Sequence, residues 1–329
     1  MYALQLEKIG SLKRKNIPVP KLESGEMLLR VTHCAVCRTD AKMWKQGHRD
    51  LILPRVLGHE ICGVSEENGK RFVVWPGNAC GCCAFCQNGL ENLCREMKVL
   101  GFHSDGGFAE YVAVPEKSLI PIPENLSGKL ACLAEPLSCT LNALEQAGVK
   151  KNQQVLIYGA GPVGLMCAMA ACYLGAVPFV SEIRAERTAQ SREFRECIGM
   201  EECHDRQREF DAVINAAPCT DTFTDGLSRL RPGGTFCLFS GLTDGKEIPS
   251  AFLNEIHYRQ LHVCGAYGCT RKQMQTALDI LKKYAKEAEM LLEKGIAPDQ
   301  IPEILPRIQE GNAMKYVIEM AAIQSSQGL

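Results

Sequence analysis

The sequence predicts an α/β protein in which a β-rich domain is joined to a doubly wound parallel sheet. Three observations lead to this fold class. Residues 155–182 run from a buried strand through a glycine-rich turn into an apolar helix and a second strand. Strands and helices then alternate as far as residue 266, a pattern typical of a parallel sheet covered on both faces. Residues 1–33, in contrast, have the short strands and turn signals of a β-rich region.

Length, charge and cysteine content limit the class of protein. A chain of 329 residues is long enough for two domains, each with its own core. A net charge of -1 without a long basic run gives no support to nucleic-acid or membrane-surface binding, and no apolar stretch is long enough to span a bilayer. The 18 cysteines are scattered through apolar runs, and no export signal opens the sequence. We therefore expect a cytoplasmic protein in which some thiols bind metal and most lie in the core.

The glycine-rich turn has the order of residues that a dinucleotide requires. Gly159 permits a tight turn, Gly161 lets backbone N–H groups approach a pyrophosphate, and Gly164 lets the helix pack closely on the strand. The N-terminus of the following helix adds a partial positive charge that attracts the phosphates. The predicted cofactor-binding residues of the turn are Gly159, Gly161, Pro162, Val163 and Gly164.

The second strand of this unit ends near Glu182, about 20 residues beyond the turn. An acid at this spacing bonds the ribose 2′-OH and would repel a 2′-phosphate. We therefore predict NAD as the cofactor in preference to NADP. Arg184 and Arg187 act in the opposite direction, because either could reach a phosphate, and we include Arg187 among the cofactor-binding residues.

A second group of candidate residues lies in the first domain. Cys37, His59 and Glu60 offer sulfur, imidazole and carboxylate, a mixture that suits a zinc site with an open position. Asp40 could accept the other N–H of a ligand histidine and fix its tautomer. Each residue taken alone is equally consistent with a core thiol, a core histidine or a surface acid. Cys34 and Cys37 also form a CxxC pair, but no thioredoxin-like βαβ unit surrounds them, so we interpret Cys34 as a core thiol.

Residues 80–94 contain the most specific local signal in the chain. The spacing C-x2-C-x2-C-x7-C is formed by Cys80, Cys83, Cys86 and Cys94. Four thiolates on one short lobe can surround zinc tetrahedrally and leave no open position, which is typical of a structural site. An iron–sulfur run would close with C-x3-C-P, which is absent, and disulfides do not suit a reducing compartment. We expect the remaining thiol, Cys82, to be uncoordinated.

Together these motifs resemble zinc-dependent medium-chain dehydrogenases, the family of alcohol, sorbitol and threonine dehydrogenases. The Glu-Pro-Leu sequence at 135–137 is similar to the polyol, sugar and threonine branch, whereas simple alcohol dehydrogenases have a cysteine there. The matching segments stand in the family order and cover nearly the whole chain: residues 37–40, 58–60, the four-cysteine lobe, 105–111, 135–137 and the glycine turn.

The resemblance implies a GroES-like catalytic domain formed by residues 1–137 and 273–329, with the structural zinc lobe at 80–94, and a Rossmann dinucleotide-binding domain at 138–272. It implies that Cys37 and His59 bind a catalytic zinc, and that Glu60 or Glu135 completes the zinc shell directly or through water. Thr39 matches the hydroxyl that begins the family's proton relay. Lys42 stands where a histidine often continues that relay. Candidate pocket-lining residues are Trp44, His48, Phe102 and His103.

From this resemblance we expect reversible oxidation of a secondary alcohol of a polyol, sugar alcohol, cyclitol or amino alcohol to a ketone, with zinc as Lewis acid and NAD as hydride acceptor. Two zinc ions per chain, a small-molecule alcohol or ketone substrate, and a homodimer or homotetramer are implied. Two alternatives stay open. One is an NADP-dependent carbonyl or enoyl reductase without catalytic zinc. The other is a non-enzymatic NAD-binding redox sensor whose zinc–thiolate lobe releases metal on oxidation.

Two local expectations concern the second domain. Residues 185–197 have the pattern of one charged amphipathic helix. Between Gly199 and Phe210, where the family has a strand and then a helix, only about ten residues remain, and a parallel crossover normally needs a dozen or more. We therefore predict that this helix is missing and that a bare loop crosses the sheet.

Overall fold

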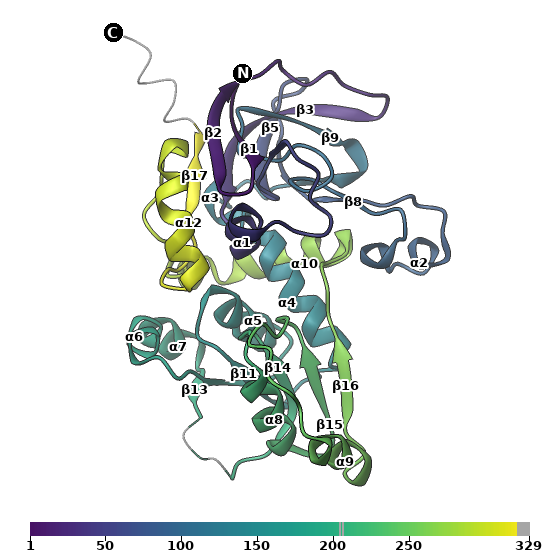
Figure 1. Cartoon of the computed structure of the whole chain (residues 1–329), viewed down its shortest axis with the longest axis vertical. Coiled ribbons are helices and arrows are strands. Elements are labelled where there is room, and N and C mark those ends of the chain that lie inside the picture. Colours follow the sequence, from purple (N-terminus) through teal and green to yellow (C-terminus); the bar gives the residue numbers. More distant parts are fainter. Residues whose placement is uncertain (204, 206, 321–329) are drawn as a thin grey trace. The chain divides into compact units, whose positions relative to one another are not determined.

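The computed structural model describes residues 1–203, 205 and 207–320, so the stretch 321–329 of the predicted catalytic domain lies outside the described residues. The chain forms two compact units (Figure 1). One consists of Met1–Glu135 together with the residues from Thr270 onwards, and the other is Pro136–Cys269.

The first unit is β-rich, as the sequence predicts. Its largest sheet has the order β10-β6-β5-β3-β17, with β9 also paired to β3, and these pairings are antiparallel. A smaller sheet has the order β2-β1-β4, and β7 pairs with β8. The strands are β1 (Tyr2–Lys8), β2 (Ser11–Asn16), β3 (Glu26–Ala35), β4 (Arg55–Val56), β5 (Glu60–Ser65), β6 (Arg71–Val74), β7 (Gly77–Asn78), β8 (Lys98–Val99), β9 (Tyr111–Pro115), β10 (Leu119–Pro121) and β17 (Val317–Glu319).

The first unit also contains α-helices, some of them in its C-terminal segment. They are α1 (Arg38–Gln46), α2 (Ala84–Gln87), α3 (Gly128–Ala131), α10 (Arg271–Lys283), α11 (Ala285–Glu289) and α12 (Ile301–Glu310). Helix α4 (Ala134–Gln146) begins in the first unit and continues into the second.

The C-terminal segment returns to the first unit through β17. Val317 pairs with Ala35 of β3, and Val36 donates its backbone N–H to Tyr316 O at 2.9 Å. Side chains from both segments, including Ile318, share one apolar core. Burial of apolar surface, at roughly 25 cal/mol per Å², therefore holds the two ends of this unit together. The residues just before β17 are placed beside the end of β3.

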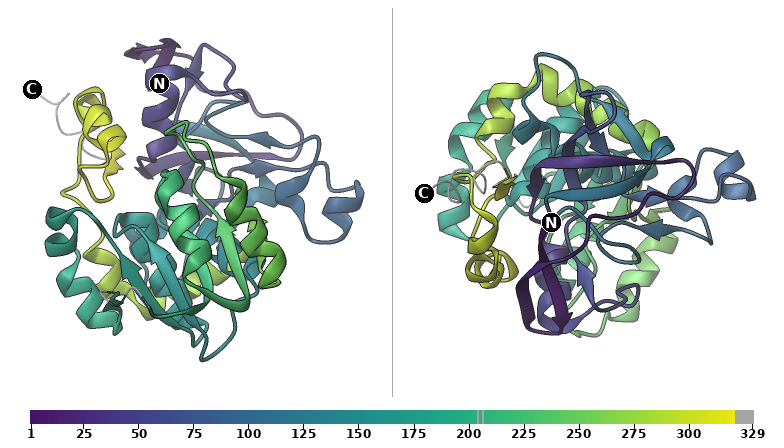
Figure 2. Two further views of the ribbon diagram at one scale, coloured as in Figure 1. Left: turned by 60° about the horizontal axis from the view of Figure 1, so that its bottom comes forward. Right: turned by 90° about the horizontal axis from the view of Figure 1, so that it is seen from above.

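The second unit contains the predicted parallel sheet. Its order is β13-β12-β11-β14-β15-β16, the strand order of a doubly wound dinucleotide domain, and all its pairings are parallel. Figure 2 shows these strands side by side with helices beside them. The elements are β11 (Gln154–Tyr158), α5 (Pro162–Tyr173), β12 (Val177–Ser181), α6 (Ala185–Gln190), α7 (Arg192–Ile198), β13 (Glu201–Glu202), β14 (Phe210–Asn215), α8 (Thr220–Ser228), β15 (Leu230–Leu238), α9 (Ser250–Tyr258) and β16 (His262–Gly265).

Two local features of this unit bear on the sequence-based expectations. The prediction of a single helix over 185–197 is wrong in detail, because the helix is interrupted at Ser191. There the buried side chain of Arg195 turns back and donates to Thr188 O at 2.9 Å. Between β13 and β14, none of the described residues 203, 205 and 207–209 is helical, as predicted. Over the whole described chain, none of the helices combines the length and apolar character that a bilayer crossing requires.

Candidate metal and cofactor sites

Cys37 lies at the N-cap of α1, two residues after the end of β3. Its Sγ accepts the backbone N–H of Thr39 at 3.4 Å, and its own N–H donates to Asp40 Oδ2 at 2.8 Å. The two side chains form a reciprocal cap, with cysteine in the place that serine or threonine usually takes. The cap fixes the position of the thiol at the start of the helix.

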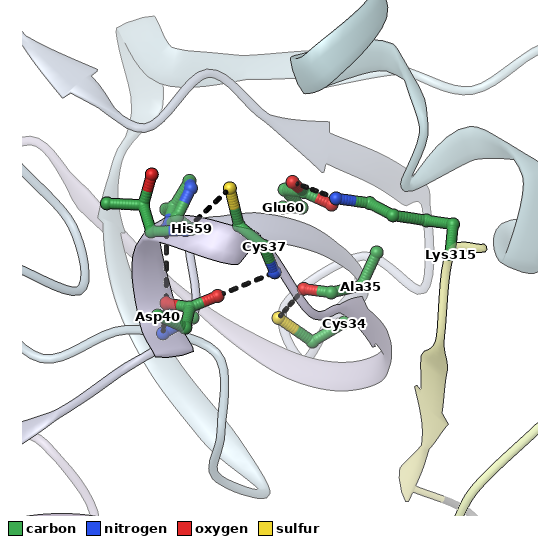
Figure 3. Close-up of polar contacts among 9 residues, drawn as sticks. Cys34, Ala35, Cys37, Asp40, His59, Glu60 and Lys315 are labelled. Carbon is green, nitrogen blue, oxygen red and sulfur yellow. Dashed lines mark hydrogen bonds and ion pairs between the residues drawn. The ribbon is translucent and has the colours of Figure 1, made fainter. Parts of the chain in front are cut away.

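Asp40 connects this helix to the start of β5. Its buried carboxylate accepts the Cys37 N–H and, through Oδ1, the Gly58 N–H at 3.3 Å. Gly58 has a φ of +93°, and an added Cβ would lie 2.4 Å from Phe108 Cδ1, so glycine is required before His59. One buried acid therefore sets the separation of Cys37 and His59, as Figure 3 shows.

Cys37, His59 and Glu60 bring three potential ligand atoms together, all within 4.8 Å of one another. Asp40 Oδ1 lies 3.4 Å from His59 Nδ1, which leaves Nε2 as the nitrogen for a metal. Glu60 Oε2 is buried and, among the residues that the structure describes, has no hydrogen-bond partner. A buried carboxylate oxygen in this state is costly unless a cation binds it. Sulfur, imidazole and carboxylate ligands at these distances fit zinc.

The electrostatics of this group also favour a cation. Burial disfavours a protonated His59, but the charges of Asp40 and Cys37 outweigh burial and raise the pKa of His59 well above its usual value. A metal ion would balance the same anionic groups without the proton. The ring of Phe102 lies 5.3 Å from the rings of both His59 and His48, so an apolar side chain borders the group.

Two other predicted site residues, Glu135 and Thr39, do not belong to the ligand group. Glu135 lies in the first turn of α4, and the ligand group formed by Cys37, His59 and Glu60 does not include it. Thr39 lies in the first turn of α1 and contacts the Cys37 thiol through its backbone N–H. Of the two acids that the sequence offers, Glu60 is thus the one gathered with the thiol and the imidazole.

Lys315 lies beside the group of Cys37, His59 and Glu60, and the sequence did not predict this residue. Its Nζ lies 2.5 Å from Glu60 Oε1, and both side chains are buried (Figure 3). Burial opposes a charged lysine, but Glu60 and then Cys37 outweigh it and raise the pKa of Lys315. The two partners stand 255 residues apart, so no local motif could connect them.

The four-cysteine lobe forms a second group of potential metal ligands. The four Sγ atoms lie within 4.8 Å of one another, with Cys83 to Cys86 at 3.5 Å and Cys80 to Cys86 at 3.9 Å. A zinc tetrathiolate with bonds of about 2.3 Å has sulfur–sulfur edges of about 3.8 Å, so the group fits tetrahedral zinc. Backbone N–H groups of residues 82 and 83 lower the pKa of Cys80 to about 6. Cys82 is exposed and lies outside the group.

The glycine turn leads from β11 into α5, and Pro162 is the first residue of that helix. Gly159 has a φ of +103°, and a Cβ on Gly164 would lie 2.0 Å from Gly159 O. Both positions therefore require glycine. A Cβ on Gly161 would lie 2.6 Å from Arg187 Nη1, so the guanidinium is directly beside the turn. A helix N-terminus next to a cation is a suitable site for an anionic phosphate.

Glu182 follows β12 and holds the adjoining backbone in place. Its Oε1 accepts the N–H groups of Ile183 and Arg184 at 2.9 Å each, and Oε2 accepts that of Ala160 at 2.9 Å. Arg187 Nη1 lies 4.0 Å from Glu182 Oε2. The acid that is predicted to bind a ribose and the arginine that could bind a phosphate thus stand next to each other.

Two family models match the chain. One, described as alcohol dehydrogenase GroES-like domain, matches residues 23–124, and the other, described as zinc-binding dehydrogenase, matches residues 162–283. The chain is 32% identical over 299 residues to a D-altritol 5-dehydrogenase of Agrobacterium fabrum, which covers 86% of this chain and 88% of the relative. It is 30% identical over 299 residues to the L-galactonate-5-dehydrogenase of Escherichia coli, covering 85% and 86% of the two chains.

The chain is also similar to a solved structure of a zinc-binding dehydrogenase. A putative zinc-binding dehydrogenase from Sinorhizobium meliloti, bound to NADP, superposes with a TM-score of 0.86 at 27% identity and covers 97% of this chain and 99% of that one. The chain therefore belongs to the zinc-binding medium-chain alcohol dehydrogenase family, and the predicted pairing of a GroES-like fold with a Rossmann-type sheet is confirmed.

Proposed function

We propose that this protein is a zinc-dependent, NAD-linked dehydrogenase that oxidises a secondary alcohol of a polyhydroxylated substrate, such as a sugar alcohol, sugar acid or cyclitol, to a ketone. The observation that carries the proposal is the buried group of Cys37, His59 and Glu60, with Asp40 behind the imidazole. Two relatives that span most of the chain are named as 5-dehydrogenases of a sugar alcohol and a sugar acid.

The proposed ligands of the catalytic zinc are Cys37 Sγ, His59 Nε2 and Glu60 Oε2. Bound there, zinc would supply Lewis-acid polarisation of the substrate hydroxyl. Asp40 Oδ1 faces His59 Nδ1 at 3.4 Å and accepts the Gly58 N–H, which holds the residues before β5. Glu60 is preferred to Glu135 because it belongs to the ligand group and because, among the described residues, its Oε2 has no hydrogen-bond partner.

Other chain residues prepare the reaction around this group. Phe102 presents an apolar ring to His59, which limits access of water. Thr39 is proposed to provide the hydroxyl that begins a proton relay: it would receive the substrate proton while passing its own proton on toward solvent. Cys80, Cys83, Cys86 and Cys94 are proposed to hold a second, structural zinc, and a homodimer or homotetramer remains a prediction.

We propose NAD as the preferred cofactor because Glu182 places a carboxylate beside the glycine turn, where it would repel a 2′-phosphate. Arg187 and the NADP-bound relative support the opposite preference, so a measurement must decide. Glu182→Ala is expected to lower the NAD-to-NADP ratio of kcat/KM by roughly 10–100-fold, the equivalent of a hydrogen bond to a charged group. Glu186→Ala, which removes an exposed acid of α6, is the matched control. A wild type that already prefers NADP would contradict the assignment.

The function itself is tested by substrate and metal measurements together. Polyols, sugar acids, inositols and threonine are screened for NADH formation, and zinc is counted by elemental analysis. We expect activity on a polyhydroxylated secondary alcohol and about two zinc ions per chain, one for each ligand group. His59→Ala should remove one zinc and the activity while NADH binding remains. A single zinc that is lost in Cys94→Ala but retained in Cys37→Ala would favour a zinc-free reductase or a redox sensor.

A further inference from the structure

The ion pair between Lys315 and Glu60 is unusual because both side chains are buried. Nζ and Oε1 lie 2.5 Å apart, and the two side chains are only 6% and 0% exposed. Removing two charges from water carries a large desolvation cost, which the attraction between them only partly offsets. An apolar pair in this place would give comparable stability, so a buried lysine here calls for a role beyond packing.

The position of Lys315 is set by the C-terminal segment. Its backbone N–H donates to Leu291 O at 2.9 Å, and the next residue, Tyr316, accepts the N–H of Val36. Val36 directly precedes Cys37 in the chain. The lysine is therefore anchored on both sides by backbone hydrogen bonds, and its ammonium group is directed at Glu60.

The lysine divides the Glu60 carboxylate into two unequal oxygens. Oε1 accepts the ammonium group, whereas Oε2 has no hydrogen-bond partner among the described residues. Glu60 also offers one carboxylate oxygen to the ligand group that it forms with Cys37 and His59. A carboxylate held in this way has one oxygen engaged by the ammonium group and one that no described donor competes for. The ammonium charge also competes with the metal for the same carboxylate.

We propose that Lys315 is a positioning residue that keeps Glu60 a one-oxygen, readily displaced partner of the catalytic metal. The inference rests on the proposed function, because it assumes a metal at Cys37, His59 and Glu60. Without the lysine, Glu60 would be a buried anion whose strongest available partner is the metal, and it would bind with both oxygens. With the lysine, the position that Glu60 occupies can be opened for a substrate.

Three substitutions test this role, because they act on Glu60 in different directions. Lys315→Met removes the competing charge, so the catalytic zinc should leave more slowly when a chromogenic chelator is added to the holoenzyme, by about tenfold or more. Lys315→Arg offers a fork that can bind both carboxylate oxygens, so zinc should leave faster than in the wild type. In a Glu60→Gln background, Lys315→Met should change the release rate by less than about twofold.

A second readout reports the number of ligands. With Co²⁺ in place of zinc, the visible absorption weakens as a site gains ligands, so Lys315→Met should show weaker bands than the wild type and Lys315→Arg should not. Lys129→Met is the matched control, since it removes an exposed 3.9 Å ion pair to Glu319 of β17 and leaves Glu60 untouched. It should alter neither readout.

Each outcome either supports or overturns the proposed role of Lys315. Slower release in the methionine variant, faster release in the arginine variant and loss of the effect in Glu60→Gln would support the role. Unchanged release, faster release in both lysine variants, or an effect equal to that of Lys129→Met would overturn it in favour of a structural pair. If Lys315→Met does not fold, the arginine variant and its Co²⁺ spectrum still decide. A wild type with zinc only in the cysteine lobe refutes the proposed metal site itself, before any lysine variant is made.

Discussion

Asp40 offers the sharpest test of how the metal group is built. The side chain is buried, accepts backbone N–H groups from Cys37 and Gly58 at 2.8 and 3.3 Å, and faces His59 Nδ1 at 3.4 Å. Asp40→Ala leaves the buried Gly58 N–H and the partly buried Cys37 N–H without this acceptor. Each hydrogen bond to a charged group contributes about 1.5–3 kcal/mol, so the upper limit is roughly 6 kcal/mol. Relief of the buried charge offsets part of this, and we expect a loss of about 3 kcal/mol.

The loss can be measured on the first unit alone. Both tryptophans of the chain, Trp44 and Trp75, lie in that unit, so their fluorescence during urea unfolding reports its stability without the second unit. Measurements with a chelator present isolate the protein term from metal binding. Asp40→Asn keeps one acceptor oxygen and should lose about half as much. Zinc affinity should fall roughly 10–100-fold in both variants, because the neighbour of the proposed ligand His59 has been changed.

A control and a refuting result complete this test. Asp105 also accepts a backbone N–H, that of Val56 at 3.0 Å, but its side chain is 48% exposed, so water can replace it. Asp105→Ala should therefore cost less than about 1 kcal/mol. Surface substitutions change the free energy of unfolding by roughly 0.5 kcal/mol at most. If the free energy of unfolding of Asp40→Ala lies within that range of the wild-type value, Asp40 does not connect α1 and β5 as we describe.

The remaining predictions concern the other sites. Gly164→Ala places a Cβ 2.0 Å from Gly159 O, so we expect NADH affinity to fall by at least tenfold. The affinity is measured by fluorescence, and the zinc content should not change. An unaltered affinity would show that the turn can relax. Cys94→Ser should reduce zinc from two ions to one and lower the thermal midpoint, whereas Cys82→Ser should alter neither, and a zinc count that falls in both variants would contradict the assignment. Gly58→Ala should destabilise the first unit by about 1–3 kcal/mol in the tryptophan assay through the clash with Phe108, and wild-type stability would rule out that contact.

Local spacing explains which parts of this molecule could be predicted from its sequence. The glycine turn and the four-cysteine lobe are short segments whose chemistry depends on neighbours in the chain, and the structure gathers the same residues. The parallel sheet followed from alternating strands and helices, and the comparisons confirm it.

What could not be predicted depends on contacts between distant residues. The sequence left Glu60 and Glu135 as equal candidates, because the choice depends on how β5 and α4 are placed around Cys37. The partner of Glu60 lies 255 residues away, and a lysine before a short strand gives no signal of burial. The break at Ser191 has the same origin, since Arg195 turns back onto Thr188 only when it is buried.

The split of the first unit has a consequence for synthesis of the protein. A ribosome completes residues 136–269 before it makes the segment that supplies β17 and Lys315. The nucleotide domain can therefore acquire its sheet on the nascent chain, while the GroES-like domain still lacks one edge of its own. The ammonium group that faces Glu60 is therefore made only after the second unit. The contact of Lys315 with the proposed catalytic metal site can thus form only after translation of the C-terminal segment, whereas all four cysteines of the proposed structural site are translated much earlier.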